Sequence, residues 1–167
     1  MKIKKIAAAA VTAAALLAAL PGAARADSGF YYEPGSYGAS NMQGVYEQKI
    51  VDAAKSAVGT RYNVLGITPE TGFTATSYIV WCLNTSGAGL YKYTDMEHLY
   101  TRAGDIAYYP HDVGDVVFFV RNGVEHAGIY IGDNKALIAG EEVREITIGE
   151  GEWEDFQVVY GKYTPYM

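Results

Sequence analysis

The chain has 167 residues, of which 13 are basic and 19 are acidic. Four of the basic residues and none of the acidic ones lie within residues 1–26, so residues 27–167 carry nine basic and 19 acidic groups, a net charge of −10. Nucleic acid and anionic lipid repel so acidic a chain, which excludes both as partners. Cys82 is the only cysteine, so no disulfide within the chain stabilises the fold.

Residues 1–26 have the pattern of a secretory signal peptide. A basic start, MKIKK, precedes an apolar run at residues 6–20 and the small-x-small sequence of residues 24–26. The run is shorter than the roughly 20 residues that a membrane-spanning helix needs. We therefore expect cleavage before Asp27, a secreted protein that is extracellular or associated with the cell wall, and no membrane contact after cleavage.

Residues 27–44 are rich in Gly, Ser and Tyr and have no sustained hydrophobic period, which favours a flexible arm. Residues 45–167 form the expected domain. An apolar stripe at helical spacing predicts a first helix that ends at Gly59, with Ile50, Ala53, Ala54, Ala57 and Val58 on its inner face. Residues 60–72 contain Gly66 and Pro69 and are predicted to form a loop.

Two further helices are predicted. The first begins at Ala75 with Thr74 as its N-cap and ends near Ser86, before Gly87. The second has Thr94 as its cap and Glu97 as the reciprocal partner of a capping box, and ends at Gly104.

From Gly114 onward the hydrophobic period changes to two, which indicates strands at residues 115–121, 124–132, 135–140, 144–149 and 156–163. Asn122-Gly123 and Asp133-Asn134 are typical of tight hairpin turns. Helices that precede an antiparallel meander define an α+β fold. On the second strand, residues 124, 126, 128 and 130 are expected to share one face.

A thiol peptidase needs a cysteine at a helix N-terminus and a facing histidine that accepts its proton, with a third polar group that orients the ring. This chain has the helix start and a strand histidine, His126. The first helical position, however, is Ala75, which has no nucleophile.

Four sequence blocks carry a resemblance to a known family: GTRY (59–62), GFTATSYIV (72–80), VGDVVFF (113–119) and HAGIYIGDN (126–134). In order and spacing they resemble the NlpC family of papain-like cell-wall endopeptidases over residues 46–163. The resemblance implies a papain-like fold in which N-terminal helices pack on the antiparallel meander, no cofactor, and the stem peptide of peptidoglycan or a cell-wall protein as partner.

The family's central block reads G-F-D-C-S-G, and here only Gly72 and Phe73 match it, while the next four residues are Thr74, Ala75, Thr76 and Ser77. By the same resemblance, His126 takes the place of the general base and Ala139 that of the ring-orienting residue. Tyr62, Phe73, Thr74 and Thr76 are then the expected substrate-binding residues. Several departures from the motif indicate a natural loss of catalysis.

Other nucleophiles are weaker candidates. Cys82 lies about 10 Å further along the predicted helix than Ala75, at 1.5 Å per residue, out of reach of a base placed for position 75. The hydroxyls of Thr74, Thr76 and Ser77 lack an oriented base, because Ala139 cannot orient one.

His98 and His111 are expected on the surface, and no metal-ligand spacing joins them to His126. Residues 150–155 are expected to form a solvated acidic turn. The predicted function is a secreted, non-catalytic domain that binds the cell wall or regulates a partner. Two alternatives remain: an active hydrolase that uses a hydroxyl, and a surface interaction protein whose working part is the 27–44 arm.

Overall fold

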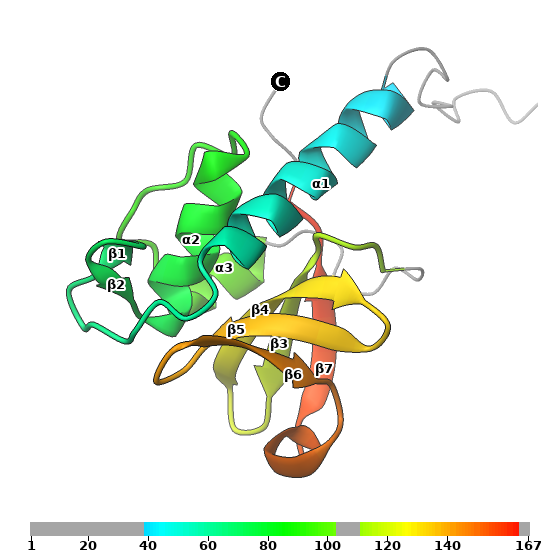
Figure 1. Cartoon of the computed structure of the whole chain (residues 1–167). Helices are drawn as coiled ribbons and strands as arrows, with labels where there is room; N and C mark the ends of the chain where they lie inside the picture. The colour runs from blue at the N-terminus through cyan, green and yellow to red at the C-terminus, as the bar shows by residue number, and fades with distance from the viewer. Residues whose placement is uncertain (1–38, 103–110, 164–167) are drawn as a thin grey trace, which may run out of the picture. The chain divides into compact units, whose positions relative to one another are not determined.

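The computed structural model describes residues 39–102 and 111–163. The elements in chain order are α1 (Ala39–Ser56), β1 (Ile67–Thr68), β2 (Gly72–Phe73), α2 (Ala75–Thr85), α3 (Met96–Arg102), β3 (Val116–Val120), β4 (Val124–Gly132), β5 (Lys135–Ala139), β6 (Val143–Thr147), the 3₁₀ turn η1 (Gly151–Trp153) and β7 (Gln157–Gly161) (Figure 1). The predicted α+β class is confirmed. No helix among the described residues is long and apolar enough to cross a membrane.

The main sheet has five strands in the order β6-β5-β4-β3-β7, all antiparallel. The predicted meander is confirmed from β3 to β6. The last strand departs from it, because β7 returns to the opposite edge and pairs with β3, with Val116 opposite Gly161. The loop that contains η1 makes this crossing under the sheet (Figure 1).

Alternating strand residues divide the core between the two faces of the sheet. On one face Phe118, Ile129 and Leu137 pack against Ile50 of α1, Ile79 of α2 and Leu99 of α3. On the other face lies a second cluster, which comprises Val117, Phe119, Ala136, Ile138, Ile146, Ile148 and Trp153. All three helices therefore cover the first face, and the η1 loop covers part of the second.

A β-bulge interrupts this alternation at the start of β4. Phe119 pairs with His126, but the next pair is Val120 with Val124, so Glu125 is the extra residue. Val124 consequently packs with the helix-side cluster, whereas Tyr130 packs with the other. The expectation that residues 124–130 alternate on one face is wrong at Val124.

The helices differ from the predictions at their ends. α1 begins at Ala39, inside the segment expected to be an arm, and residues 1–38 lie outside the described residues. Val58 is exposed, because the helix ends two residues before it. In α3 the cap is Asp95, whose carboxylate accepts a hydrogen bond from the N–H of His98 at 2.7 Å, instead of Thr94. The predicted end at Gly104 lies outside the described residues.

The segment expected to be a plain loop contains a small hairpin, in which Ile67 of β1 pairs with Phe73 of β2. Two predicted turns are close to the expectation. Asp133 and Asn134 both have positive φ, 51° and 59°, as a two-residue hairpin turn of type I′ requires. The β3–β4 loop has three residues, 121–123, because of the bulge.

Candidate functional site

Residues 59–63 form an extended segment that joins the start of α2 to the β5–β6 turn. On one side the N–H of Tyr62 donates to the carbonyl of Glu141 at 2.8 Å, and the N–H of Gly59 to that of Val143 at 2.8 Å. On the other side the N–H of Phe73 donates to the carbonyl of Arg61 at 3.1 Å. The GTRY and GFTAT blocks are therefore neighbours in space as well as in sequence.

The start of α2 is closed by a reciprocal cap. The N–H of Ser77 donates to Thr74 Oγ1 at 3.1 Å, and the N–H of Thr74 donates to Ser77 Oγ at 2.9 Å. The hydroxyl of Ser77 itself donates to the carbonyl of Gly66 at 2.8 Å. Thr74 is confirmed as the N-cap, and both hydroxyls have structural partners.

This geometry weighs against the hydroxyl nucleophiles. Ser77 is buried, and its hydroxyl would have to give up its hydrogen bonds to Thr74 and Gly66 before it could attack a substrate. Thr76 is half-buried at the second position of α2, and Ala75 at the first.

His126 projects from the face of the sheet that the helices do not cover. Its ring lies 5.3 Å from that of Trp153 and 6.4 Å from that of Phe156, both edge-on. The guanidinium of Arg121 lies 4.3 Å from the Phe156 ring centre. It also forms an ion pair with Glu125, with Arg121 Nη2 at 2.7 Å from Glu125 Oε2. The hydrogen bond from Arg121 lowers the pKa of the Glu125 carboxyl below its ordinary value.

A surface pocket of about 690 Å³ opens beside His126. Its described lining comprises Arg61, His126, Ile138, Gly140, Glu141, Glu142, Arg144, Glu152 and Trp153. No residue of α2 is among them. The structure thus brings His126 together with the β5–β6 turn and η1.

The third catalytic position needs a correction. Ala139 is buried in the helix-side cluster, on the face away from the His126 pocket. Its neighbour Ile138 lines that pocket, and pairs with Gly128, which is two residues beyond His126 on β4. The strand alternation therefore places Ile138, and not Ala139, where a ring-orienting residue would stand. Either residue lacks a polar atom to orient an imidazole.

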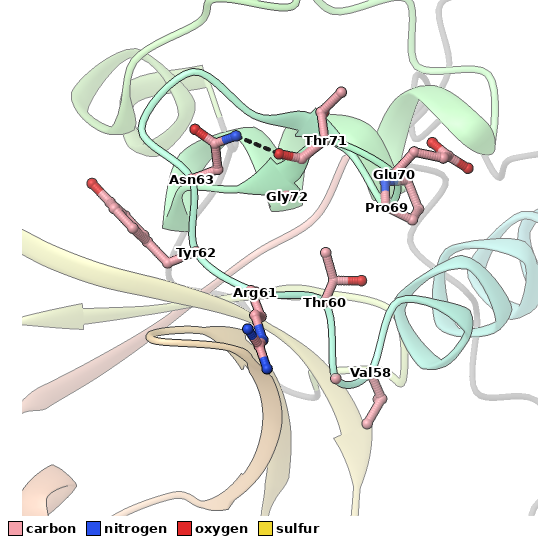
Figure 2. A pocket seen from close by; sticks show the side chains of 10 residues that line it. Val58, Thr60, Arg61, Tyr62, Asn63, Pro69, Glu70, Thr71 and Gly72 are labelled. Carbon is pink, nitrogen blue, oxygen red and sulfur yellow. Dashed lines mark hydrogen bonds between the residues drawn. The ribbon is translucent and has the colours of Figure 1, made fainter.

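Two of the expected substrate-binding residues differ in their exposure to solvent. Phe73 is a core residue, 1% exposed, with its ring against those of Tyr78 and Trp81, so the prediction that it lines the cleft is wrong. Tyr62 is 55% exposed and lines a second pocket of about 590 Å³ between residues 58–63 and 69–72. Figure 2 shows that the Tyr62 ring and the Arg61 side chain leave their shared segment in different directions.

Cys82 is fully buried, and burial raises the pKa of its thiol far above the ordinary value. It is an inert core residue, as its stripe predicts. His98 is exposed, as expected. His111 is half-buried instead, stacked on Tyr160 with ring centres 3.8 Å apart. Among the described residues no group of three His, Cys, Asp or Glu side chains is placed to hold a metal ion.

The sequence did not indicate the charged lining of the His126 pocket. Arg61 belongs to the GTRY block, but its side chain carried no local signal. Glu152 and Trp153 lie in the acidic turn of residues 150–155, in which Trp153 is 6% exposed. A tryptophan among acidic residues was the available signal that this turn covers a core.

The model of the NlpC/P60 family matches residues 59–162. The probable peptidoglycan endopeptidase LytE of Bacillus subtilis (strain 168) is 34% identical over 108 residues, which are 59% of this chain and 29% of that protein. The chain thus spans less than a third of the length of this relative.

Among solved structures, the chain is similar to RipD from Mycobacterium tuberculosis, a non-catalytic NlpC/p60 domain protein with an adaptation to peptidoglycan-binding function. The TM-score is 0.56 at 16% identity, over 70% of this chain and 96% of that one. The P60 domain of an antigen from M. avium paratuberculosis gives 0.61 at 15% identity, over 75% and 98% of the two chains. At these identities the likeness shows the fold.

Proposed function

The chain belongs to the NlpC/P60 family, and on that premise we propose that it is a secreted, non-catalytic domain that binds the stem peptide of peptidoglycan. The observation that carries this proposal is the start of α2: its first residue is Ala75, which the sequence resemblance aligns with the family's nucleophile and which has only a methyl group. The hydroxyls of Thr74 and Ser77 close the helix cap, and that of Ser77 also donates to the carbonyl of Gly66.

The surroundings of His126 support the same conclusion. A general base needs a partner within about 3 Å that donates a proton and a polar group that holds the ring. His126 instead packs edge-on against Trp153, and Ile138 lines the wall beside it. An imidazole in that setting is a binding residue, because it offers a ring face and a hydrogen-bonding nitrogen without a catalytic partner.

The relatives fit this proposal in two ways. The similarity to LytE supports a peptidoglycan peptide as the ligand class, although it covers only part of that protein. RipD provides a precedent for an NlpC/P60 domain without catalysis that binds peptidoglycan. Residues 1–26 supply the route to the wall in this proposal, and mass spectrometry of the exported protein should find an N-terminus at Asp27.

Co-sedimentation with purified cell-wall sacculi tests the binding. We expect the protein to pellet with sacculi, and Tyr62→Ser to reduce the bound fraction, because Tyr62 is exposed beside the pockets. Tyr91→Ser is the matched control: Tyr91 is 69% exposed and lines neither pocket. Binding that both variants retain in full would contradict the proposed surface.

Two rival functions predict different results. A hydrolase that uses a hydroxyl would release soluble muropeptides from the same sacculi. A surface protein that uses its N-terminal segment would fail to pellet, and its partner contact would be lost on deletion of residues 27–38, which precede α1.

A further inference from the structure

Charged side chains line the pocket beside His126, and only some of them form ion pairs among the described residues. Five of its lining residues are ionic: Arg61, Glu141, Glu142, Arg144 and Glu152. Arg144 and Glu152 form an ion pair with each other. Among the described residues, the side chains of Arg61, Glu141 and Glu142 have no such partner.

Backbone pairing places Arg61 next to Glu141 and Glu142. Arg61 and Glu142 face each other across an isolated antiparallel bridge, and the N–H of Tyr62 holds the carbonyl of Glu141. In Figure 2 the Arg61 side chain points from its segment toward the β5–β6 turn, away from Thr71 and Glu70. One positive and two negative residues therefore line one pocket.

The wall and the size of the pocket favour a small organic ligand. Trp153 and Ile138 supply apolar surface, and His126 adds an imidazole ring. A volume of about 690 Å³ lies within the range of small-molecule sites, which is roughly 300–1,000 Å³. A few precisely placed polar groups in such a site fix the orientation of the ligand.

From this arrangement we infer that the pocket binds the zwitterionic end of a short peptide, with its carboxylate on Arg61 and its ammonium group on Glu141 and Glu142. A ligand with only negative groups would face two unpaired carboxylates, and one with only positive groups would face Arg61. Arginine suits the first role because its planar guanidinium binds a carboxylate through two parallel hydrogen bonds. The inference rests on the proposed function, since it names the chemistry of the peptide that the same face would bind.

Titration calorimetry with three matched peptides tests it: Nα-acetyl-Ala-Lys, its C-terminal amide, and its Nε-acetyl form. The first carries one carboxylate and one ammonium group, and each of the others lacks one of these charges at nearly unchanged size. Hydrogen bonds to charged groups are among the stronger ones in proteins, so we expect each modified peptide to bind at least about tenfold more weakly.

Variants assign each charge to its residue. Arg61→Gln should abolish the preference for the carboxylate over the amide and keep the preference for the free amine. Glu141→Gln combined with Glu142→Gln should do the reverse. Lys135→Gln is the control, because Lys135 is a half-buried β5 lysine, pairs with Glu145 and lies outside the pocket lining. Equal binding of all three peptides to the unaltered protein would overturn the inference, as would an unchanged preference in both pocket variants.

Sacculus binding separates this inference from the proposed function. Co-sedimentation without any charge preference among the peptides would overturn the inference and leave the proposed function standing. A clear charge preference without co-sedimentation would support the zwitterion pocket and refute peptidoglycan as its source.

Discussion

Replacement of Ser77 by Ala tests the start of α2 most sharply. The substitution removes the acceptor of the Thr74 N–H, at 2.9 Å, and the donor to the Gly66 carbonyl, at 2.8 Å. A buried polar group that loses its partner costs about 1–3 kcal/mol. Because the Thr74 N–H is only partly buried and keeps some access to water, the two groups together predict a loss of about 2–4 kcal/mol in the free energy of unfolding. This is a large part of the roughly 5–15 kcal/mol that holds a domain together.

Thermal and urea unfolding measure this loss. At roughly 4 °C per kcal/mol for a domain of this size, the melting temperature should fall by about 10 °C. Thr85→Ala is the matched control, because it removes an exposed hydroxyl at the other end of the same helix and should cost less than about 0.5 kcal/mol. An unchanged melting temperature in Ser77→Ala would refute the reasoning and return Ser77 to the candidate nucleophiles.

Three other predictions concern the core. Cys82 should resist a thiol reagent at pH 8 in the native protein and react fully in denaturant, because burial raises the pKa of its thiol. Gly128→Ala should cost about 1–3 kcal/mol, because the new Cβ would lie 2.8 Å from Ile138 Cγ2; unfolding measurements check it. Burial also raises the pKa of Asp115 above its ordinary 3.8, so the folded state binds this proton more tightly. The protonation of Asp115 therefore contributes its full stabilisation of the folded state below about pH 4. This contribution is lost as the pH rises through the raised pKa. Asp115→Asn should remove that decline, which unfolding measurements at a series of pH values upward from pH 4 would detect.

Each of these has a clear contrary result. Rapid reaction of one thiol in the native protein would show that Cys82 is accessible. Gly44→Ala is the control for Gly128, since its Cβ meets nothing within 4 Å on α1 and should be neutral or stabilising. For Asp115, a stability gap between wild type and variant that widens in favour of wild type as the pH rises would contradict the assigned direction.

The sequence predicted correctly those caps and turns that depend only on residues close together in the chain. Thr74 caps α2 because its hydroxyl reaches the third N–H of the helix, and Asp133-Asn134 turns because both residues tolerate positive φ. The α3 cap was missed by one residue, since Thr94 and Asp95 are both good caps. Thr94 bonds instead to the carbonyl of Tyr91 at 2.5 Å.

Features that depend on pairing between distant segments were not predictable from periodicity. The bulge at Glu125 moves Val124 to the other face, and the register of β5 places Ile138 rather than Ala139 on the pocket side. A one-residue shift reverses the face of every side chain. The pocket was not predicted for the same reason, because the pairing of Arg61 with Glu142 joins residues that lie 81 positions apart in the sequence.

The central claim is that this domain binds without cleaving, and muropeptide release measures it directly. Sacculi are digested with the unaltered protein and with Ala75→Cys, and the soluble products are analysed by mass spectrometry. Both proteins should release nothing above background, because a thiol at position 75 still lacks an oriented base: Ile138 lines the wall beside His126. Muropeptides from the unaltered protein that disappear in His126→Ala would contradict the account.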